Sequence, residues 1–286
     1  MYKVWLQEKH LGMEPVLAHY YADVLKKHIS NLSFTKPKCD TCKQCDIFDI
    51  MLKQTLTEDE RRTTLKNLEH HQLMADKGYG MPKKILEEAG NDVMVVCMHL
   101  QRALLTPKLS TGIAFYKRKM WTYNFCVHNY RTGTGHMFMG DEIAAKRGAS
   151  EIASCVNTFI KKYVPPTVRK LVTFSNNCSC QNKNFTLILF YLYLIHCGRF
   201  YEVDHIYFQS GHTYMQADGD FSSIETAKRN CQYLYTPEDY VNLVKTCRRK
   251  KKFVVQKMSQ EDFLEWDVLK AYVTKRTNPE FTFLNS

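Results

Sequence analysis

The sequence predicts an α/β protein built on a mixed five-stranded sheet, and two features of the chain carry that prediction. From position 93, three strand patterns follow one another, and the second and third are separated by a tight turn. After position 147, helix and strand patterns alternate. The chain has 286 residues and 44% hydrophobic composition, which is enough to bury one or two substantial cores.

The first 90 residues are predicted to form a helical region. The segment PVLAHYYADVLKKHI (15–29) has apolar residues at helical spacing. A second helix is predicted over 52–75, where Thr57 followed by Glu60 has the spacing of a capping box. Between the two helices, FTKPKCDTCKQCD (34–46) is predicted to be a turn-rich loop bearing cysteines.

The strands of the predicted core begin with VMVVCMHLQ (93–101), a continuous apolar run. An alternating aromatic strand, KRKMWTYNFCVHNY (117–130), is followed after the turn 131–135 by its hairpin partner GHMFMGDE (135–142).

The second half of the core alternates helices with strands. Helical spacing over 148–163 ends before Pro165 and Pro166, which cannot continue a helix. A strand (169–175), a helix (184–197), a strand (201–209) and a helix (220–235) follow. The order β-β-β-α-β-α-β-α over 91–235 is the RNase H-like arrangement. Residues 236–286 are predicted to be a small extension, with a short strand and a helix over 253–273.

The charge of the chain favours an anionic partner. A formal net charge of +11 and a pI near 9.0 are typical of proteins that bind nucleic acid. The segment after position 247 is strongly basic, and it could contact phosphates, act as a nuclear import signal or be a solvated turn. The candidate nucleic-acid-binding residues are Arg248, Arg249, Lys250, Lys251 and Lys252.

The sequence favours a soluble protein with no membrane partner. The start of the chain lacks the apolar segment of a signal peptide, and the longest apolar run (185–197) is too short to span a bilayer. We expect a nuclear or cytoplasmic location, with the nucleus favoured. The eleven cysteines are then expected to be core residues, free thiols or metal ligands.

The cysteine loop is a candidate zinc site. Cys39, Cys42 and Cys45 are three residues apart, and His70 and His71 lie in the helix that follows. Structural zinc requires four such ligands in a tetrahedron. We expect Cys42, Cys45 and one of the two histidines to bind zinc, with Cys39 or His28 as the fourth ligand; a thiol cluster without metal is the alternative. His196 and His212, near strand ends, are interpreted as core or turn histidines.

Several motifs extend these predictions. Met98 to Gln101 precede a TPKL turn, SNNCSCQNKN follows the strand 169–175, and GHTYMQADGDFSSIE (211–225) precedes and enters the last core helix. Together they resemble the transposon-derived RNase H-like domain of DDE-type integrases and transposases in animal genomes, from about Tyr2 to Arg229. The resemblance implies that the family's cysteine pair corresponds to Cys42 and Cys45, with a histidine in the later helix.

The resemblance also assigns the positions of the catalytic carboxylates. The family's first metal-binding aspartate corresponds to His99, its second to Asn176 and its third to Asp218, while Glu225 is retained and a family histidine corresponds to Phe221. Two divalent ions require anionic oxygen ligands, so we expect magnesium and manganese not to bind. The residues either form a transition-metal site at His99, Asp218 and Glu225 or remain as polar core residues.

Three functions follow as hypotheses. The first is a domesticated, catalytically inactive transposase core that binds nucleic acid or a nuclear protein partner, including a second copy of itself. The second is an active nuclease using Asp218, Asp220 and Glu225 with Asp141 or Glu142. The third is a protein-interaction module without nucleic-acid binding. The missing carboxylates weigh against enzymatic activity.

Overall fold

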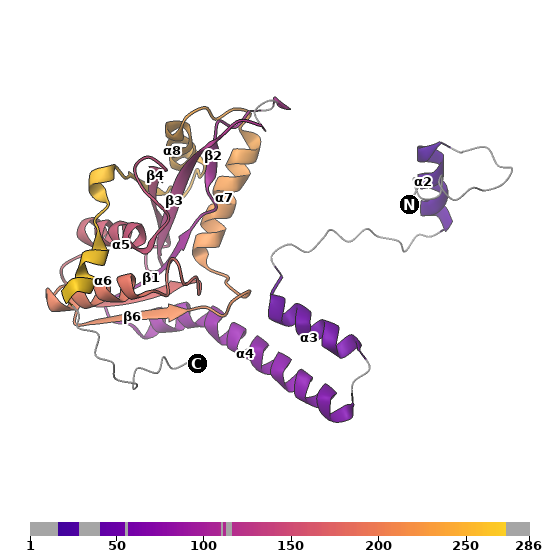
Figure 1. Cartoon of the computed structure of the whole chain (residues 1–286), viewed down its shortest axis with the longest axis horizontal. Helices are drawn as coiled ribbons and strands as arrows, with labels where there is room; N and C mark the ends of the chain where they lie inside the picture. The colour runs from indigo at the N-terminus through magenta and orange to yellow at the C-terminus, as the bar shows by residue number, and fades with distance from the viewer. Residues whose placement is uncertain (1–16, 29–40, 55–56, 110, 113–115, 273–286) are drawn as a thin grey trace. The chain divides into compact units, whose positions relative to one another are not determined.

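The computed structural model describes residues 17–28, 41–54, 57–109, 111–112 and 116–272. The chain divides into two compact units, Met1–Thr41 and Cys42–Ser286. In the first unit, α2 (Ala18–His28) is an amphipathic helix with no buried residue. The second unit holds the sheet and the remaining helices (Figure 1).

The second unit is built on a mixed sheet. The strands are β1 (Val93–Leu100), β2 (Leu104–Thr106), β3 (Met120–Asn129), β4 (Thr134–Asp141), β5 (Lys170–Ser175), β6 (Glu202–Tyr207) and β7 (Val254–Lys257). Their spatial order is β6-β5-β1-β3-β4-β7, with β2 paired to β3. The pairs β1–β3, β2–β3 and β3–β4 are antiparallel, whereas β1–β5, β5–β6 and β4–β7 are parallel.

The predicted α/β class and mixed sheet are confirmed, but the sheet has seven strands in place of five. β2 is only three residues long, too short to show an alternating pattern. β7 corresponds to the short strand expected in the C-terminal extension, and it joins the sheet by pairing with β4 from His136↔Val254 to Met139↔Lys257.

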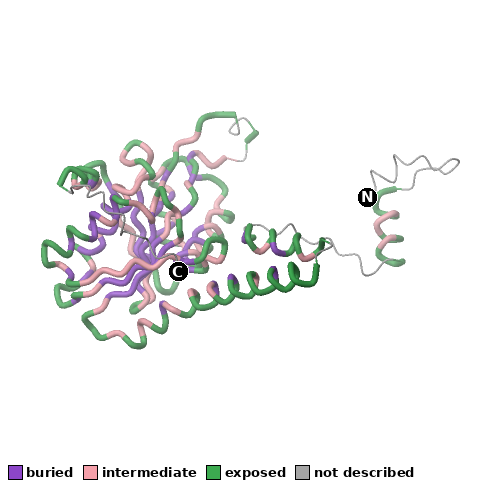
Figure 2. Tube along the Cα trace, turned by 60° about the horizontal axis from the view of Figure 1, so that its bottom comes forward, coloured by how far each residue is buried: buried purple, intermediate pink, exposed green. Residues whose placement is uncertain are grey.

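Helices cover both faces of the sheet (Figure 1). The helices of the second unit are α3 (Lys43–Lys53), α4 (Glu58–Glu88), α5 (Ala149–Tyr163), α6 (Phe185–His196), α7 (Gln216–Asn230), α8 (Pro237–Thr246) and the 3-10 helices η2 (Gln260–Asp262) and η3 (Trp266–Tyr272). Among them, α3 packs on α4 and does not cover the sheet (Figure 1). One core joins the sheet to α5, α6 and η3, and the other joins it to α7, α8 and the C-terminal end of α4. Figure 2 shows the buried strands between these layers.

The alternation of side chains along β1 decides which of them face which core. Met94, Val96 and Met98 belong to the core under α5 and α6, whereas Val95 and Cys97 belong to the core under α7. His99 continues the second series and therefore faces α7.

In the part of the chain that the structure describes, no helix is long and apolar enough to cross a membrane.

Some helix boundaries agree with local signals in the sequence, and others differ from the prediction. α3 occupies part of the predicted loop, α4 runs to Glu88 and not to position 75, and α7 spans Gln216–Asn230 and not 220–235. The predicted capping box of Thr57 and Glu60 is present at the start of α4. α8 was not predicted, although Thr236 caps it and Pro237 occupies its first turn. The helix expected at the end of the extension consists instead of η2 and η3, anchored by the buried Trp266, whose ring lies 4.6 Å from that of Phe190.

Candidate functional site

Two cysteines and two histidines form a cluster at the base of the α3–α4 hairpin. Cys42 is the N-cap residue of α3 and Cys45 lies in its first turn, so the expected cysteine loop is partly helical. His71 is buried on α4, and His212 lies between β6 and α7. The four ligand atoms all lie within 4.8 Å of one another.

The spacing of these atoms fits a tetrahedral metal ion. Cys42 Sγ lies 3.2 Å from His71 Nε2, Cys45 Sγ lies 3.3 Å from His212 Nε2, and the two Nε2 atoms are 3.1 Å apart. With zinc-ligand bonds of about 2.0–2.3 Å, tetrahedral geometry separates ligand atoms by about 3.3–3.8 Å. Two sulfur and two imidazole nitrogen donors therefore lie close enough together to hold one metal ion.

The backbone around His212 approaches the cysteines closely. Gly211 has φ of +82°, and a Cβ there would lie 2.7 Å from Cys42 Cβ and 2.8 Å from its Sγ. The carbonyl of Ser210 accepts a hydrogen bond from the Cys42 thiol at 3.5 Å, and the side chain of Gln209 contacts the second ring nitrogen of His71 at 3.4 Å. Glycine at 211 is required by both the conformation and the space.

The electrostatics of the cluster favour neutral ligands when no cation is present. Burial lowers the pKa of His71, and the charges of His212 and His70 lower it further. Burial and the hydrogen bond with Cys42 raise the pKa of Cys45. A bound metal ion would reverse this balance by displacing the thiol protons.

The structure brings together some of the candidate ligands and separates others. Cys42, Cys45 and His71 lie together, whereas the neighbouring His70 is exposed and outside the cluster. Cys39 lies outside the described residues, and His28 belongs to the other unit. His212, interpreted from the sequence as a core or turn histidine, closes a turn by donating its backbone N–H to the carbonyl of Gln209. Its ring also brings a fourth potential ligand atom to the cluster. His196 is exposed at the end of α6.

A second group of polar residues lies at the carboxyl ends of β1 and β5. His99 is on β1, Asn176 directly follows β5, and Asp218 is in the first turn of α7. His99 Nε2 lies 3.6 Å from Asp218 Oδ1, and its Nδ1 lies 3.5 Å from Asn176 Nδ2. The three positions that the resemblance to RNase H-like domains assigns to metal ligands therefore lie together.

This group carries little negative charge. Burial lowers the pKa of His99, against the opposing effect of Asp218, so the imidazole is neutral at pH 7. Glu225 accepts a hydrogen bond from Gln101 at 2.9 Å and pairs with Lys228 at 2.6 Å. Asp218 is the carboxylate that remains next to His99 and Asn176.

His99 and Asp218 line a cleft of about 610 Å³. Its wall includes Phe221 and Tyr240, and two of its cations, Arg102 and Lys119, form no ion pair within the described residues. Arg102 and Lys119 were not singled out in the sequence, and Gln101 was noted only as part of a motif, because only the fold shows that they share this cleft with α7.

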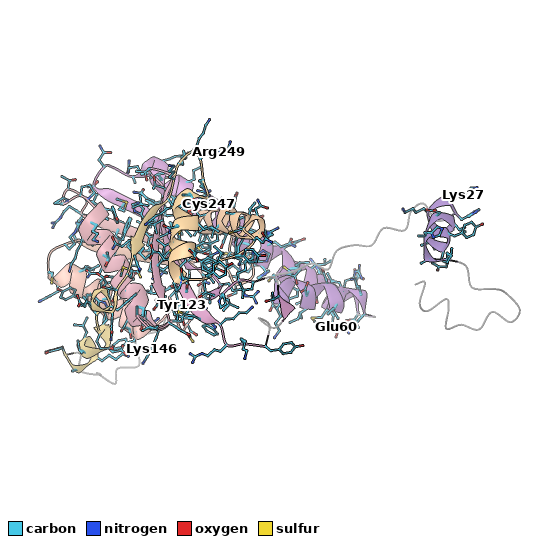
Figure 3. The ribbon with its side chains drawn as sticks, turned by 90° about the horizontal axis from the view of Figure 1, so that it is seen from above. Lys27, Glu60, Tyr123, Lys146, Cys247 and Arg249 are labelled. Carbon is cyan, nitrogen blue, oxygen red and sulfur yellow. The ribbon has the colours of Figure 1, made fainter. Side chains whose placement is uncertain are left out.

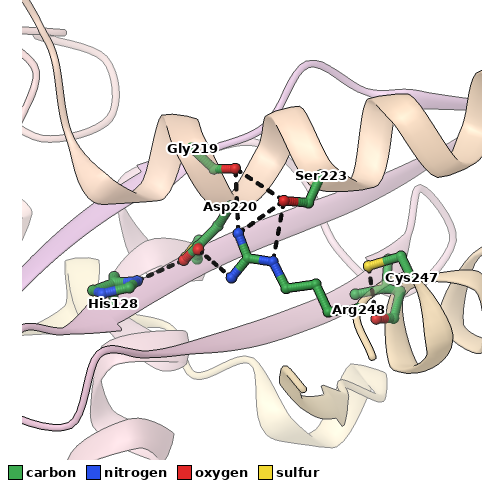
Figure 4. A network of polar contacts seen from close by, with 8 residues as sticks. His128, Gly219, Asp220, Ser223, Cys247 and Arg248 are labelled. Atoms are coloured by element: carbon green, nitrogen blue, oxygen red, sulfur yellow. Dashed lines mark hydrogen bonds and ion pairs between the residues drawn. The ribbon is translucent and has the colours of Figure 1, made fainter. Parts of the chain in front are cut away.

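Asp220 faces a different part of the molecule. Its side chain is 4% exposed, with Oδ2 at 2.6 Å from His128 Nδ1 and Oδ1 at 2.8 Å from Arg248 Nη1. The same guanidinium donates to the hydroxyl of Ser223 and to the carbonyl of Gly219 (Figure 4). Asp220 and Arg248 therefore form an internal ion pair, and the remaining basic residues, 249–252, are exposed.

The comparisons with known proteins give one match. A family model described as Domain of unknown function (DUF7869) matches residues 150–283, just under half of the chain. The comparisons with curated proteins and with solved structures found no match. From the first turn of α5 to beyond η3, a range that includes Asn176, His212 and Asp218, the chain is thus similar to a domain of unknown function.

Proposed function

We propose that this protein is a catalytically inactive, transposase-derived RNase H-like protein that binds nucleic acid. Three antiparallel strands in the order β1-β3-β4, followed by two strands parallel to β1 on its other side, are what an RNase H-like core requires. The helices α5, α6 and α7 are distributed over both faces of this sheet, as in such a core.

One observation carries the proposal of inactivity. His99, Asn176 and Asp218 converge at the carboxyl ends of β1 and β5, where an RNase H-like nuclease would hold its divalent ions. A neutral imidazole and an amide replace two carboxylates there. Hard cations such as magnesium bind weakly without anionic oxygens, so two-metal phosphodiester cleavage is not supported.

The binding role rests on charge and shape. The chain has a net charge of +11. Two cations that line the cleft, Arg102 and Lys119, form no ion pair in the described part of the chain. Such cations attract the phosphate groups of a nucleic acid, which are present along its whole length. Phe221 and Tyr240 give the same cleft an aromatic wall.

The proposal includes a structural zinc ion at Cys42, Cys45, His71 and His212. The donor set and spacing fit tetrahedral zinc, and each of the four ligand atoms lies within 3.3 Å of another ligand atom. Zinc would fasten the α3–α4 hairpin to the loop before α7.

An active nuclease with a rearranged site is the less favoured alternative. It would need Asp218 and Asp220 to face the same ions, but Asp220 is held by His128 and Arg248. A transition metal at His99, Asp218 and Glu225 would first have to displace Lys228 from Glu225.

Calorimetry tests the proposed inactivity. We expect no heat of magnesium or manganese binding with the natural chain, and binding with the His99→Asp, Asn176→Asp double variant. A matched control, His99→Asp with Asn177→Asp, adds the same charge at an exposed neighbour. Binding of two ions by the natural chain would show that the site is not inactivated.

A salt series tests nucleic-acid binding. Affinity for duplex DNA should fall steeply with salt, and Arg102→Ala with Lys119→Ala should reduce the logarithmic slope by about 1.8, at roughly 0.9 per lost phosphate contact. Lys83→Ala with Lys84→Ala removes the same charge from the exposed side of α4 as a control. No salt-dependent binding would favour a protein-interaction module.

A further inference from the structure

A groove runs along α7 on the side away from the cleft. Two adjoining hollows of about 750 and 470 Å³ share Ala227, Asn230 and Cys247 and lie between α7, α8 and the segment joining them. The groove and the cleft both reach Ser222, but Asp218, Phe221 and Glu225 belong to the cleft alone.

The groove is lined by apolar and polar side chains together and carries little negative charge. Asn230 and Asn242 offer side-chain amides that form no hydrogen bond within the described residues. The one carboxylate in the lining, Asp239, accepts hydrogen bonds from the backbone N–H groups of Tyr235 and Thr236. With its one carboxylate hydrogen-bonded to the backbone, the lining suits an uncharged or anionic ligand better than a cation.

Two tyrosines lie at one end of the groove. The rings of Tyr233 and Tyr235 stack with centroids 5.9 Å apart and planes 20° apart. Tyr233 is 40% exposed and Tyr235 is 62% exposed. Stacked rings with accessible outer faces form a platform on which a planar group such as a nucleobase can stack.

Arg248 lines the other end of the groove, and four more cations follow it along the chain. Arg249, Lys250, Lys251 and Lys252 are exposed and form no ion pair within the part of the chain that the structure describes. Figure 3 shows Arg249 projecting from the body beside Cys247, which lines the groove. The ten residues of α8 separate the tyrosines from the cations by about 15 Å.

We propose that this groove binds single-stranded nucleic acid. Unstacked bases would lie on Tyr233 and Tyr235, and the backbone would follow the amide-lined groove to Arg249 and its neighbours. The separation of about 15 Å between the tyrosines and the cations fits a single strand of a few nucleotides. A duplex keeps its bases stacked on one another, so the tyrosines could not stack on them. The site is distinct from the cleft and goes beyond the function proposed for it.

Fluorescence anisotropy with a labelled 12-nucleotide oligothymidylate tests this site in the full chain. We expect Tyr233→Ala with Tyr235→Ala to weaken binding about 10-fold or more, because base stacking on an aromatic side chain is lost. Arg249→Ala with Lys250→Ala should reduce the salt slope by about 1.4, at roughly 0.7 per contact for a single strand.

Two control variants match these changes on α4. Tyr79→Ala removes a tyrosine that is 68% exposed, and Lys83→Ala with Lys84→Ala removes two exposed charges. Equal losses in the controls, or groove variants that bind like the natural chain, would overturn the groove as a site. Single-strand binding lost only with Arg102→Ala and Lys119→Ala would place the ligand in the cleft, refuting the groove while supporting the proposed function. Absence of any nucleic-acid binding would refute both.

Discussion

Replacing Arg248 by alanine is expected to destabilise the second unit strongly. The guanidinium pairs with Asp220 at 2.8 Å and donates to Ser223 at 2.8 and 3.1 Å. It also lies 4.3 Å from the ring centroid of Phe253. The Asp220 side chain is only 4% exposed, so the variant would leave a buried carboxylate with the His128 ring as its remaining close hydrogen-bonding partner.

The expected loss is about 3–5 kcal/mol of unfolding free energy, the range for breaking one side of a buried ion pair. At roughly 3 °C per kcal/mol for a chain of this size, the melting temperature would fall by about 10 °C. Most of this loss comes from the uncompensated charge of Asp220, since contacts of a partly exposed arginine are worth less.

Urea and thermal unfolding of three variants would test this reasoning. Arg249→Ala changes an exposed arginine next along the chain and should alter stability by less than about 0.5 kcal/mol. Asp220→Asn added to Arg248→Ala should recover part of the loss, because an amide carries no buried charge. The reasoning would be refuted if Arg248→Ala and Arg249→Ala unfolded alike, or if Asp220→Asn made the first variant less stable.

Three further predictions concern the metal cluster and the sheet. Cys45→Ser should abolish binding of one zinc ion per chain, measured by atomic absorption after dialysis, whereas His70→Ala should retain it, since His70 lies outside the cluster. Gly211→Ala should lower both zinc affinity and melting temperature, because its Cβ would overlap Cys42, while Gly80→Ala, with no atom within 4 Å, should not destabilise the chain. Retained zinc in the first variant, or normal affinity in the second, would contradict the site. His136 is buried, and burial lowers its pKa to about 4. Between about pH 6.5 and 4 the unfolded state therefore binds one more proton than the folded state, so stability decreases as the pH is lowered through that window. His136→Phe, which keeps the packing on nearby rings, should flatten this part of the stability profile; an unchanged profile would show that other groups cause it.

Much of the fold could be predicted because its signals are local. The apolar run of β1 and the helix that stops before Pro165 specify their elements through neighbouring residues alone. α8 could also have been predicted, since Thr236, Pro237 and Asp239 form a complete start signal. The pairing of β7 with β4 could not, because an edge strand's partner depends on the arrangement of the whole sheet.

The candidate sites likewise contain residues that local sequence signals reveal and residues that only the fold brings together. Cys42 and Cys45 stand out by their spacing, but His212 is 141 residues from His71 and only folding brings it there. The opposite directions of Asp218 and Asp220 could have been predicted. Side chains two positions apart on a helix point about 200° from each other, so Asp218 and Asp220 could not both face one pair of metal ions.

The distribution of the cluster's ligands along the chain has a consequence for biosynthesis. Cys42, Cys45 and His71 leave the ribosome early, whereas His212 follows His71 by 141 residues. At about 5–20 residues per second, roughly 7–30 seconds separate the third ligand from the fourth. A metal captured by the nascent hairpin would hold an open coordination position during that interval, available to water or to another thiol. Coordination by all four ligands would then require that synthesis has passed β6 and that the loop before α7 has folded against the hairpin.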